Sequence, residues 1–217
     1  MGGDSQPTAP DALLLLATGC PHCPAVLEGL GALLKEGVIG RLEVVNIAMH
    51  PEVAQALGVR TVPWTRIGPF ELDGALPPAE LRLWAEAAFK PEGMKAYFFQ
   101  MLKNGRRDKV ERAIRTEPQR SVIFAELMRD PDTSMAVRLG ISAVLEELHG
   151  TGLTDPLIPA LAELSRSGDA LTRADACHFL SLIGGDAIIP HLRACLDDED
   201  SEVCEIAQEA LAEITHK

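Results

Sequence analysis

Cys20 and Cys23 are the residues of this 217-residue chain whose types and spacing best support chemistry. They stand three positions apart in Cys20-Pro-His-Cys23, with His22 between them. Across the first turn of a helix, this spacing brings two sulfur atoms close enough to form a disulfide. The partial positive charge of the helix N-terminus also stabilises a thiolate on the outer cysteine. The spacing therefore predicts a redox-active dithiol.

The two cysteines are expected to have different roles. Cys20, at the outer position, is the predicted nucleophile. Cys23 lies one turn inside the helix and is expected to resolve the mixed disulfide that Cys20 forms with a substrate. The His22 imidazole is expected to stabilise the Cys20 thiolate, which favours the reduced form and makes the pair more oxidising. Pro21 fits the first helical position and is a candidate substrate contact beside Cys20.

Zinc binding is the alternative use of such a pair, with His22 as a third ligand. Tetrahedral zinc needs a second ligand cluster, and Cys177, Cys195 and Cys204 do not provide one in the sequence. Spacing and context therefore favour redox chemistry, and no metal site is predicted.

The elements around the pair predict an α/β domain. An apolar run over residues 12–17 predicts a strand buried on both faces, which leads directly into the cysteines and the following helix. Further along, the patterns predict strands over 41–47, 61–67 and 70–73, with helices over 51–57 and 78–89. The order is βαβαββα, with the first two strands parallel.

Cys20-Pro-His-Cys23 after a buried strand, together with Thr61-Val-Pro63 at the start of a later one, resembles the thioredoxin superfamily over residues 10–90. The resemblance implies that Pro63 follows a cis peptide bond and lies against the cysteines, where the Val62 backbone would bind an extended substrate peptide. The alternative for Pro63 is an ordinary edge-strand proline. The Pro-His dipeptide is similar to that of bacterial disulfide oxidases. The short core is closer to glutaredoxins, which would make glutathione a co-substrate.

Two departures from that family affect the expected chemistry. Gly19 stands where thioredoxins carry a tryptophan, and the leucines at 13–16 stand where they carry a buried acid. Proton transfer to or from Cys23 would then use water or His22. Trp64 either replaces part of the aromatic wall beside the substrate or packs in the core.

The second half of the sequence predicts an all-α helical repeat. Asp155-Pro-Leu-Ile-Pro159 aligns with Asp186-Ala-Ile-Ile-Pro190, and each precedes a second amphipathic helix. Such helix hairpins bury their apolar faces only by stacking, which predicts a short solenoid. The pattern of an acidic turn followed by Val137-Arg138 or Thr172-Arg173 resembles HEAT-like repeats, which implies protein binding. Three helices share one apolar spacing: Val137, Ile141, Val144, Leu145 and Leu148; Thr172, Ala176, Phe179, Leu180 and Ile183; Val203, Ala207, Ala210, Leu211 and Ile214.

Charge and composition exclude several functions. The net charge is −12, and residues 121–217 carry 6 basic and 18 acidic side chains, so binding to nucleic acid is not expected. The apolar run at 12–17 is too short to span a membrane and lacks a preceding basic residue, so no membrane segment is predicted. Five cysteines, an odd number, fit a reducing compartment, and a cytoplasmic location is expected.

Together these patterns predict a thioredoxin-fold redox domain over 1–90, a helical connector over 91–120 and HEAT-like helical repeats over 121–217. The predicted function is a thiol–disulfide oxidoreductase acting on protein disulfides, with the acidic repeats binding a protein client. The alternative is an interaction adaptor or redox sensor whose thioredoxin fold does not turn over. The electron donor, the use of glutathione and the oligomeric state stay open.

Overall fold

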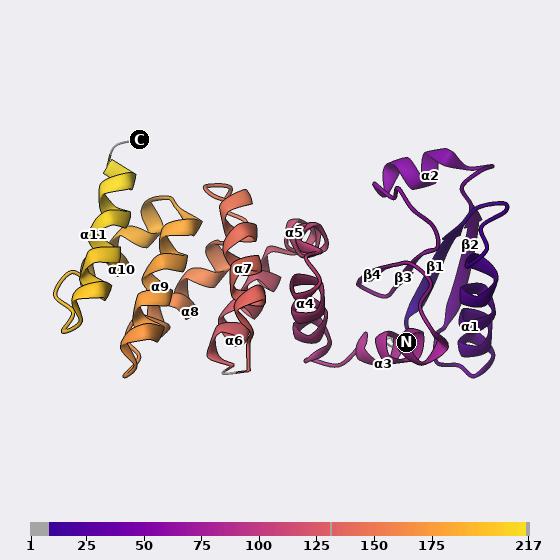
Figure 1. The fold of residues 1–217 in the computed structure, drawn as a ribbon, viewed down its shortest axis with the longest axis horizontal. Helices are drawn as coiled ribbons and strands as arrows, with labels where there is room; N and C mark the ends of the chain where they lie inside the picture. Colours follow the sequence, from indigo (N-terminus) through magenta and orange to yellow (C-terminus); the bar gives the residue numbers. More distant parts are fainter. Residues whose placement is uncertain (1–8, 131, 216–217) are drawn as a thin grey trace, which may run out of the picture. The chain divides into compact units, whose positions relative to one another are not determined.

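The computed structural model describes residues 9–130 and 132–215 and divides the chain into two compact units. The first unit ends at Met94 and the second begins at Lys95. The first unit is a small mixed sheet with helices, and the second consists of helices (Figure 1). The predicted layout of an α/β part followed by an all-α part is therefore confirmed.

The sheet of the first unit has four strands in the order β2-β1-β3-β4. The central strand β1 pairs in parallel with β2 and antiparallel with β3, and β3 pairs antiparallel with β4. The predicted parallel pairing of the first two strands is confirmed. The bounds are β1 (Asp11–Leu16), β2 (Arg41–Asn46), β3 (Trp64–Ile67) and β4 (Phe70–Asp73).

Strand β3 is shorter than the predicted strand over 61–67 because it begins at Trp64. Pro63, the residue before it, has no amide hydrogen and cannot donate to the hydrogen-bond ladder of a sheet. The regular ladder therefore starts only at Trp64, and Pro63 contributes its carbonyl oxygen alone, which accepts from the Gly74 amide at 2.9 Å.

Three helices complete the first unit: α1 (Cys23–Lys35), α2 (Pro51–Ala56) and α3 (Pro78–Ala87). Each has proline in its first turn, where the missing amide costs no intrahelical hydrogen bond. The apolar side chains of α1 at Val26, Leu30 and Leu33 are buried. Gly29 lets α3 approach closely, since a Cβ there would lie 3.0 Å from Leu81 Cδ1. The element order is the predicted βαβαββα.

The core of the first unit is built on β1. Its residues from Ala12 to Leu15 are almost completely buried, as expected for a strand covered on both faces. One core cluster joins Leu13 and Leu15 to Ala54 of α2 and to Trp64 of β3. This cluster connects α2 to the sheet and fixes the start of β3 at the end of β1 where the cysteines follow.

The second unit contains helices that follow one another in pairs (Figure 1). Helices α7, α9 and α11 contact one another in sequence order, and α8 and α10 pack against the helices that follow them. Short 3₁₀ turns at Asp155–Leu157 and Asp186–Ile188 precede α8 and α10, so the two aligned sequence segments form the same structure. The bounds are α4 (Gly93–Lys103), α5 (Arg107–Thr116), α6 (Ile123–Arg129), α7 (Met135–Glu147), α8 (Ile158–Leu164), α9 (Ala170–Ile183), α10 (Ile189–Ala194) and α11 (Ser201–Thr215).

Helix α4 packs into the second unit through its aromatic face. Phe98 is fully buried, and its ring centroid lies 5.8 Å from that of Phe124 on α6. Gly140 of α7 lets Leu102 approach, because a Cβ there would lie 3.1 Å from the leucine side chain. The apolar side chains of α4 at Tyr97, Phe98, Met101 and Leu102 are all buried and therefore form internal packing.

Candidate functional site

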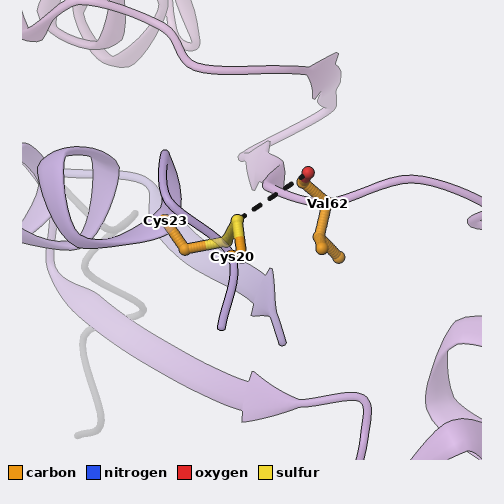
Figure 2. The surroundings of a disulfide bond; sticks show 3 residues. All are labelled: Cys20, Cys23 and Val62. Carbon is orange, nitrogen blue, oxygen red and sulfur yellow. Dashed lines mark hydrogen bonds between the residues drawn. A yellow bond between two sulfur atoms is a disulfide. The ribbon is translucent and has the colours of Figure 1, made fainter. Parts of the chain in front are cut away.

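Cys20 and Cys23 form a disulfide at the point where β1 leads into α1 (Figure 2). Cys23 is the first residue of α1, so the prediction that it lies one turn inside the helix is wrong, and Pro21 precedes the helix and does not take its first position. The two Cα atoms are 5.6 Å apart. Cys23 is 3% exposed, whereas Cys20 is partly exposed. Solvent and a protein substrate therefore reach the sulfur of Cys20 more readily than that of Cys23.

The turn that carries Cys20 is fixed to the neighbouring strands by hydrogen bonds. The Cys20 amide donates to the Ala17 carbonyl at 3.2 Å, and the Ile47 amide donates to the Leu16 carbonyl at 2.8 Å. The Asn46 side-chain amide at the end of β2 donates to the Thr18 hydroxyl at 3.0 Å. These contacts hold the outer cysteine at the carboxyl end of the parallel strand pair.

The segment before β3 lies beside the disulfide. The Val62–Pro63 peptide bond is cis, as the sequence resemblance implies. The Val62 carbonyl oxygen is 4.0 Å from Cys20 Sγ and points toward it (Figure 2). A sulfur in a disulfide carries no hydrogen, so this is a contact in the oxidised form; after reduction, the Cys20 thiol can donate to the same oxygen. The structure thus brings Cys20, Val62 and Pro63 together although they are about 40 residues apart in the chain.

His22 and Pro21 lie on the exposed side of the site. Both side chains are exposed. His22 is the N-cap residue of α1 and makes no side-chain capping hydrogen bond. Its imidazole is therefore presented at the helix N-terminus next to the two cysteines in sequence, where it can exchange protons with water.

Trp64 does not lie on the surface of the site. Its side chain is 0% exposed and packs in the cluster formed with Leu13, Leu15 and Ala54. A substrate cannot touch a side chain that is fully covered by the core. Of the two roles that the sequence leaves open for Trp64, the structure supports core packing, and the predicted substrate contact is not available in this structure.

A second set of polar contacts joins successive helix pairs in the second unit. Arg138 at the start of α7 donates to Asp175 on α9 at 2.9 Å and to the Met128 carbonyl at 3.1 Å. Arg173 at the start of α9 donates to both carboxylate oxygens of Asp198 at 2.8 and 2.9 Å. The two arginines that the sequence places at matching repeat positions therefore both connect one helix pair to the next.

Arg173→Met should lower the urea midpoint of the second unit far more than a matched surface change. The Arg173 side chain is 8% exposed and that of Asp198 is 12% exposed, so the substitution leaves a carboxylate enclosed without its charged partner. The control is Arg129→Met. The side chains of the Arg129–Glu163 ion pair are 42% and 78% exposed, so its loss should change the urea midpoint very little. Chemical unfolding followed by circular dichroism compares them, and equal midpoints for the two variants would contradict the expectation.

The same pair makes the second unit acid-sensitive. Hydrogen bonds from Arg173 and from the Asp200 amide hold the pKa of Asp198 below its ordinary value of 3.8. A depressed folded-state pKa contributes stability above the unfolded-state value and loses it as the pH falls through the folded-state value. Asp198→Asn should therefore reduce the loss of stability below about pH 4. Urea unfolding at pH 7 and pH 3 gives the loss of unfolding free energy for the wild type and the variant. An equal loss in both would argue against a role for Asp198 in the acid sensitivity.

The remaining cysteines lie in the second unit. Cys177 and Cys195 are 0% and 3% exposed, as expected for structural thiols, and Cys204 is partly buried. The Cys195 thiol donates to the His191 carbonyl oxygen at 3.4 Å.

Two further features are absent from the described part of the chain. No group of three or more His, Cys, Asp or Glu side chains within it is arranged to hold a metal ion. None of the helices in residues 9–130 and 132–215 is both long and apolar enough to cross a membrane.

One comparison with known proteins found a match within the second unit. Residues 121–212 match the family of HEAT repeats. This match covers α6 to α10 and most of α11, and it supports the repeat that the sequence predicts. A search of the curated proteins found no match to this chain.

Proposed function

We propose that the first unit is a thioredoxin-fold thiol–disulfide oxidoreductase and that the HEAT-like repeats, as a short solenoid, bind the protein client on which it acts. The observation that carries the proposal is the Cys20–Cys23 disulfide at the start of α1, with the Val62 carbonyl and the cis Pro63 beside the partly exposed Cys20. The strand order and the βαβαββα sequence of elements support the same fold.

In the reducing direction, the Cys20 thiolate attacks one sulfur of a client disulfide. A mixed disulfide forms, and the second client sulfur leaves as a thiolate that takes up a proton from water. Cys23 then loses its proton and attacks Cys20 Sγ, which releases the first client sulfur and forms the Cys20–Cys23 disulfide. Two electrons pass from the cysteine pair to the client, and the reverse sequence oxidises a client dithiol.

The helix N-terminus supplies the electrostatic part of this chemistry. The partial positive charge at the start of α1 stabilises the Cys20 thiolate as nucleophile or leaving group. Leu13, Leu14 and Leu15 occupy the buried part of β1, so that stretch of strand contributes no carboxylate to accept the Cys23 proton. Water or the exposed His22 imidazole takes that role in the proposal.

The client is expected to bind in an extended conformation across the segment before β3. The Val62 backbone would pair with the client chain as a strand does, while Pro63 packs against the reacting sulfurs. Pro21, exposed beside Cys20, would provide the facing contact. A protein client supplies both the extended backbone and the disulfide that this arrangement needs.

The second unit would select the client. HEAT repeats chiefly bind proteins, and residues 121–217 carry 18 acidic side chains against 6 basic ones. A client with a basic surface would be drawn to this unit by long-range attraction that salt weakens.

A turnover assay tests the proposal. The full chain should accelerate the reduction of a disulfide-bonded model protein by dithiothreitol, and Cys20→Ser should not. A matched control is Cys204→Ser, which changes a cysteine in the other unit and should keep full activity. Equal rates for the wild type and Cys20→Ser would overturn the proposed enzyme.

A second candidate function is an adaptor or redox sensor in which the cysteine pair does not turn over. The buried stretch of β1, which is entirely apolar, favours it because rapid dithiol exchange depends on a group that accepts the Cys23 proton. In the same assay, the adaptor would show a disulfide that forms and breaks but no catalytic acceleration.

A further inference from the structure

Exposed apolar side chains gather along one edge of the second unit. The turns that precede α7, α9 and α11 lie on this edge (Figure 1). Met135 and Leu139 near the start of α7 are 69% and 62% exposed, and Leu171 at the start of α9 is 67% exposed. Leu196, in the turn before α11, is 40% exposed. These four side chains are called the apolar edge below.

An ion pair joins α7 and α9 within this surface. Arg138 Nη1 of α7 lies 2.9 Å from Asp175 Oδ2 of α9. Met135 and Leu139 stand four positions apart and share a face of α7, and Leu139 follows Arg138 directly. Leu171 stands four positions before Asp175 and shares its face of α9. The three exposed side chains therefore lie on neighbouring faces of two helices that are in contact.

The turns along the same edge are acidic. Residues 130–134, 165–169 and 195–200 carry two, one and four acidic side chains, against the single basic Arg166. Asp132 and Asp169 are exposed, and the Glu199 side chain is 86% exposed. An exposed apolar surface of a soluble protein marks an interaction site, and negative charge beside it favours a partner that is both apolar and basic.

From this arrangement we infer that the apolar edge binds a cationic amphipathic helix of the protein client. Large apolar side chains of that helix pack on Met135, Leu139 and Leu171, and its Lys or Arg side chains lie against the acidic turns. Methionine adapts its shape to such a partner. Side chains seven positions apart on a helix are about 10 Å apart along its axis, which is close to the spacing of about 8–10 Å between packed helices. The client helix can therefore contact α7 and α9 with successive apolar residues.

This inference rests on the client-binding role proposed for the repeats, and binding of a defined peptide to the full chain tests it. The probe is a fluorescein-labelled peptide of about 18 residues, or five helical turns, made of leucine and lysine in an amphipathic pattern. A second peptide replaces each leucine by serine and keeps the charge. Fluorescence anisotropy gives the Kd of each, and the leucine–lysine peptide should bind at least about tenfold more tightly, since burial of its leucines adds to the attraction.

The apolar contribution is tested by combining Met135→Ser, Leu139→Ser and Leu171→Ser. This triple variant should bind the leucine–lysine peptide about tenfold more weakly than the wild type, because the surface that covers the leucines is lost. The matched control is Leu83→Ser with Phe89→Ser, which changes apolar side chains of the first unit that are 56% and 54% exposed. The control should leave the Kd unchanged.

The charge contribution has its own pair of variants. Asp132→Asn with Asp197→Asn removes two exposed charges from the acidic turns and should weaken binding of both peptides, most strongly at low salt. The control is Glu28→Gln with Glu92→Gln, which removes two exposed charges from the first unit and should weaken binding less.

Three results would overturn the inference: equal affinity for the two peptides, an unchanged Kd in the triple variant, or a dimer in sedimentation velocity that the triple variant loses. The first two would mean non-specific attraction to an acidic surface, and the third would mean that a second copy of the chain covers the apolar edge. Cys20→Ser should bind the leucine–lysine peptide as the wild type does. Failure of the binding test therefore leaves the proposed dithiol chemistry untouched, and failure of turnover leaves the binding result untouched.

Discussion

Cys23→Ser should accumulate a covalent mixed disulfide between Cys20 and a client protein, whereas Cys20→Ser should accumulate none. Without the Cys23 sulfur, no internal thiolate can release the client from Cys20, so the intermediate persists. The nearly complete burial of Cys23 and the partial exposure of Cys20 support this assignment of roles. Non-reducing electrophoresis of each variant after mixing with a disulfide-bonded client, with and without dithiothreitol, measures the adduct.

The control for this experiment is Cys23→Ser combined with Cys20→Ser, which removes both sulfurs and should give no adduct. An adduct of equal amount in Cys20→Ser alone would mean that Cys23 attacks the client or that another cysteine is reactive. Either result would contradict the assignment of Cys20 as nucleophile. Repeating the comparison in a Cys195→Ser background shows whether this cysteine of the second unit contributes to the adduct.

Phe98→Ala should destabilise the second unit by about 3–5 kcal/mol, the usual cost of removing a fully buried phenylalanine. Phe98 is 0% exposed, and its ring packs on Phe124 of α6. The cavity left behind would loosen α4 from the first helix pair of the repeat. Urea unfolding monitored by circular dichroism gives the free energy of unfolding for comparison with the wild type.

Phe89→Ala is the matched control, because it makes the same chemical change at a side chain that is 54% exposed. Its expected effect is within about 0.5 kcal/mol of the wild type. Similar losses for the two variants would show that the α4 aromatic face contributes no more than an exposed phenylalanine. The packing described for the start of the second unit would then be wrong.

The sequence predicted the elements of both units well where a local signal determined them. Prolines in the first turn of α2 and α3 and the continuous apolar run of β1 determine those elements through neighbouring residues alone. The start of α1 was predicted too early, because Pro21 precedes the helix that begins at Cys23. The repeat followed from the spacing of apolar residues, which records the helix face that must be covered. Strand β3 was predicted too long, since apolar residues before Pro63 favour a strand while the missing amide excludes one.

The site was only partly predictable. The Cys20–Cys23 pairing followed from spacing on a helix turn, and the cis bond at Pro63 followed from a resemblance. The burial of Trp64 depends on α2, which covers it from another part of the chain, and the sequence left its role open.

An equilibrium redox titration of the Cys20/Cys23 pair in the purified full chain tests the proposed enzyme most directly. The protein is equilibrated in glutathione buffers, and alkylation of the peptide that carries both cysteines reports its oxidation separately from the second unit. A single reversible two-electron transition, absent in Cys20→Ser and in Cys23→Ser, is the expected result. A pair that stays in one redox state across the whole range would contradict a working thiol–disulfide oxidoreductase.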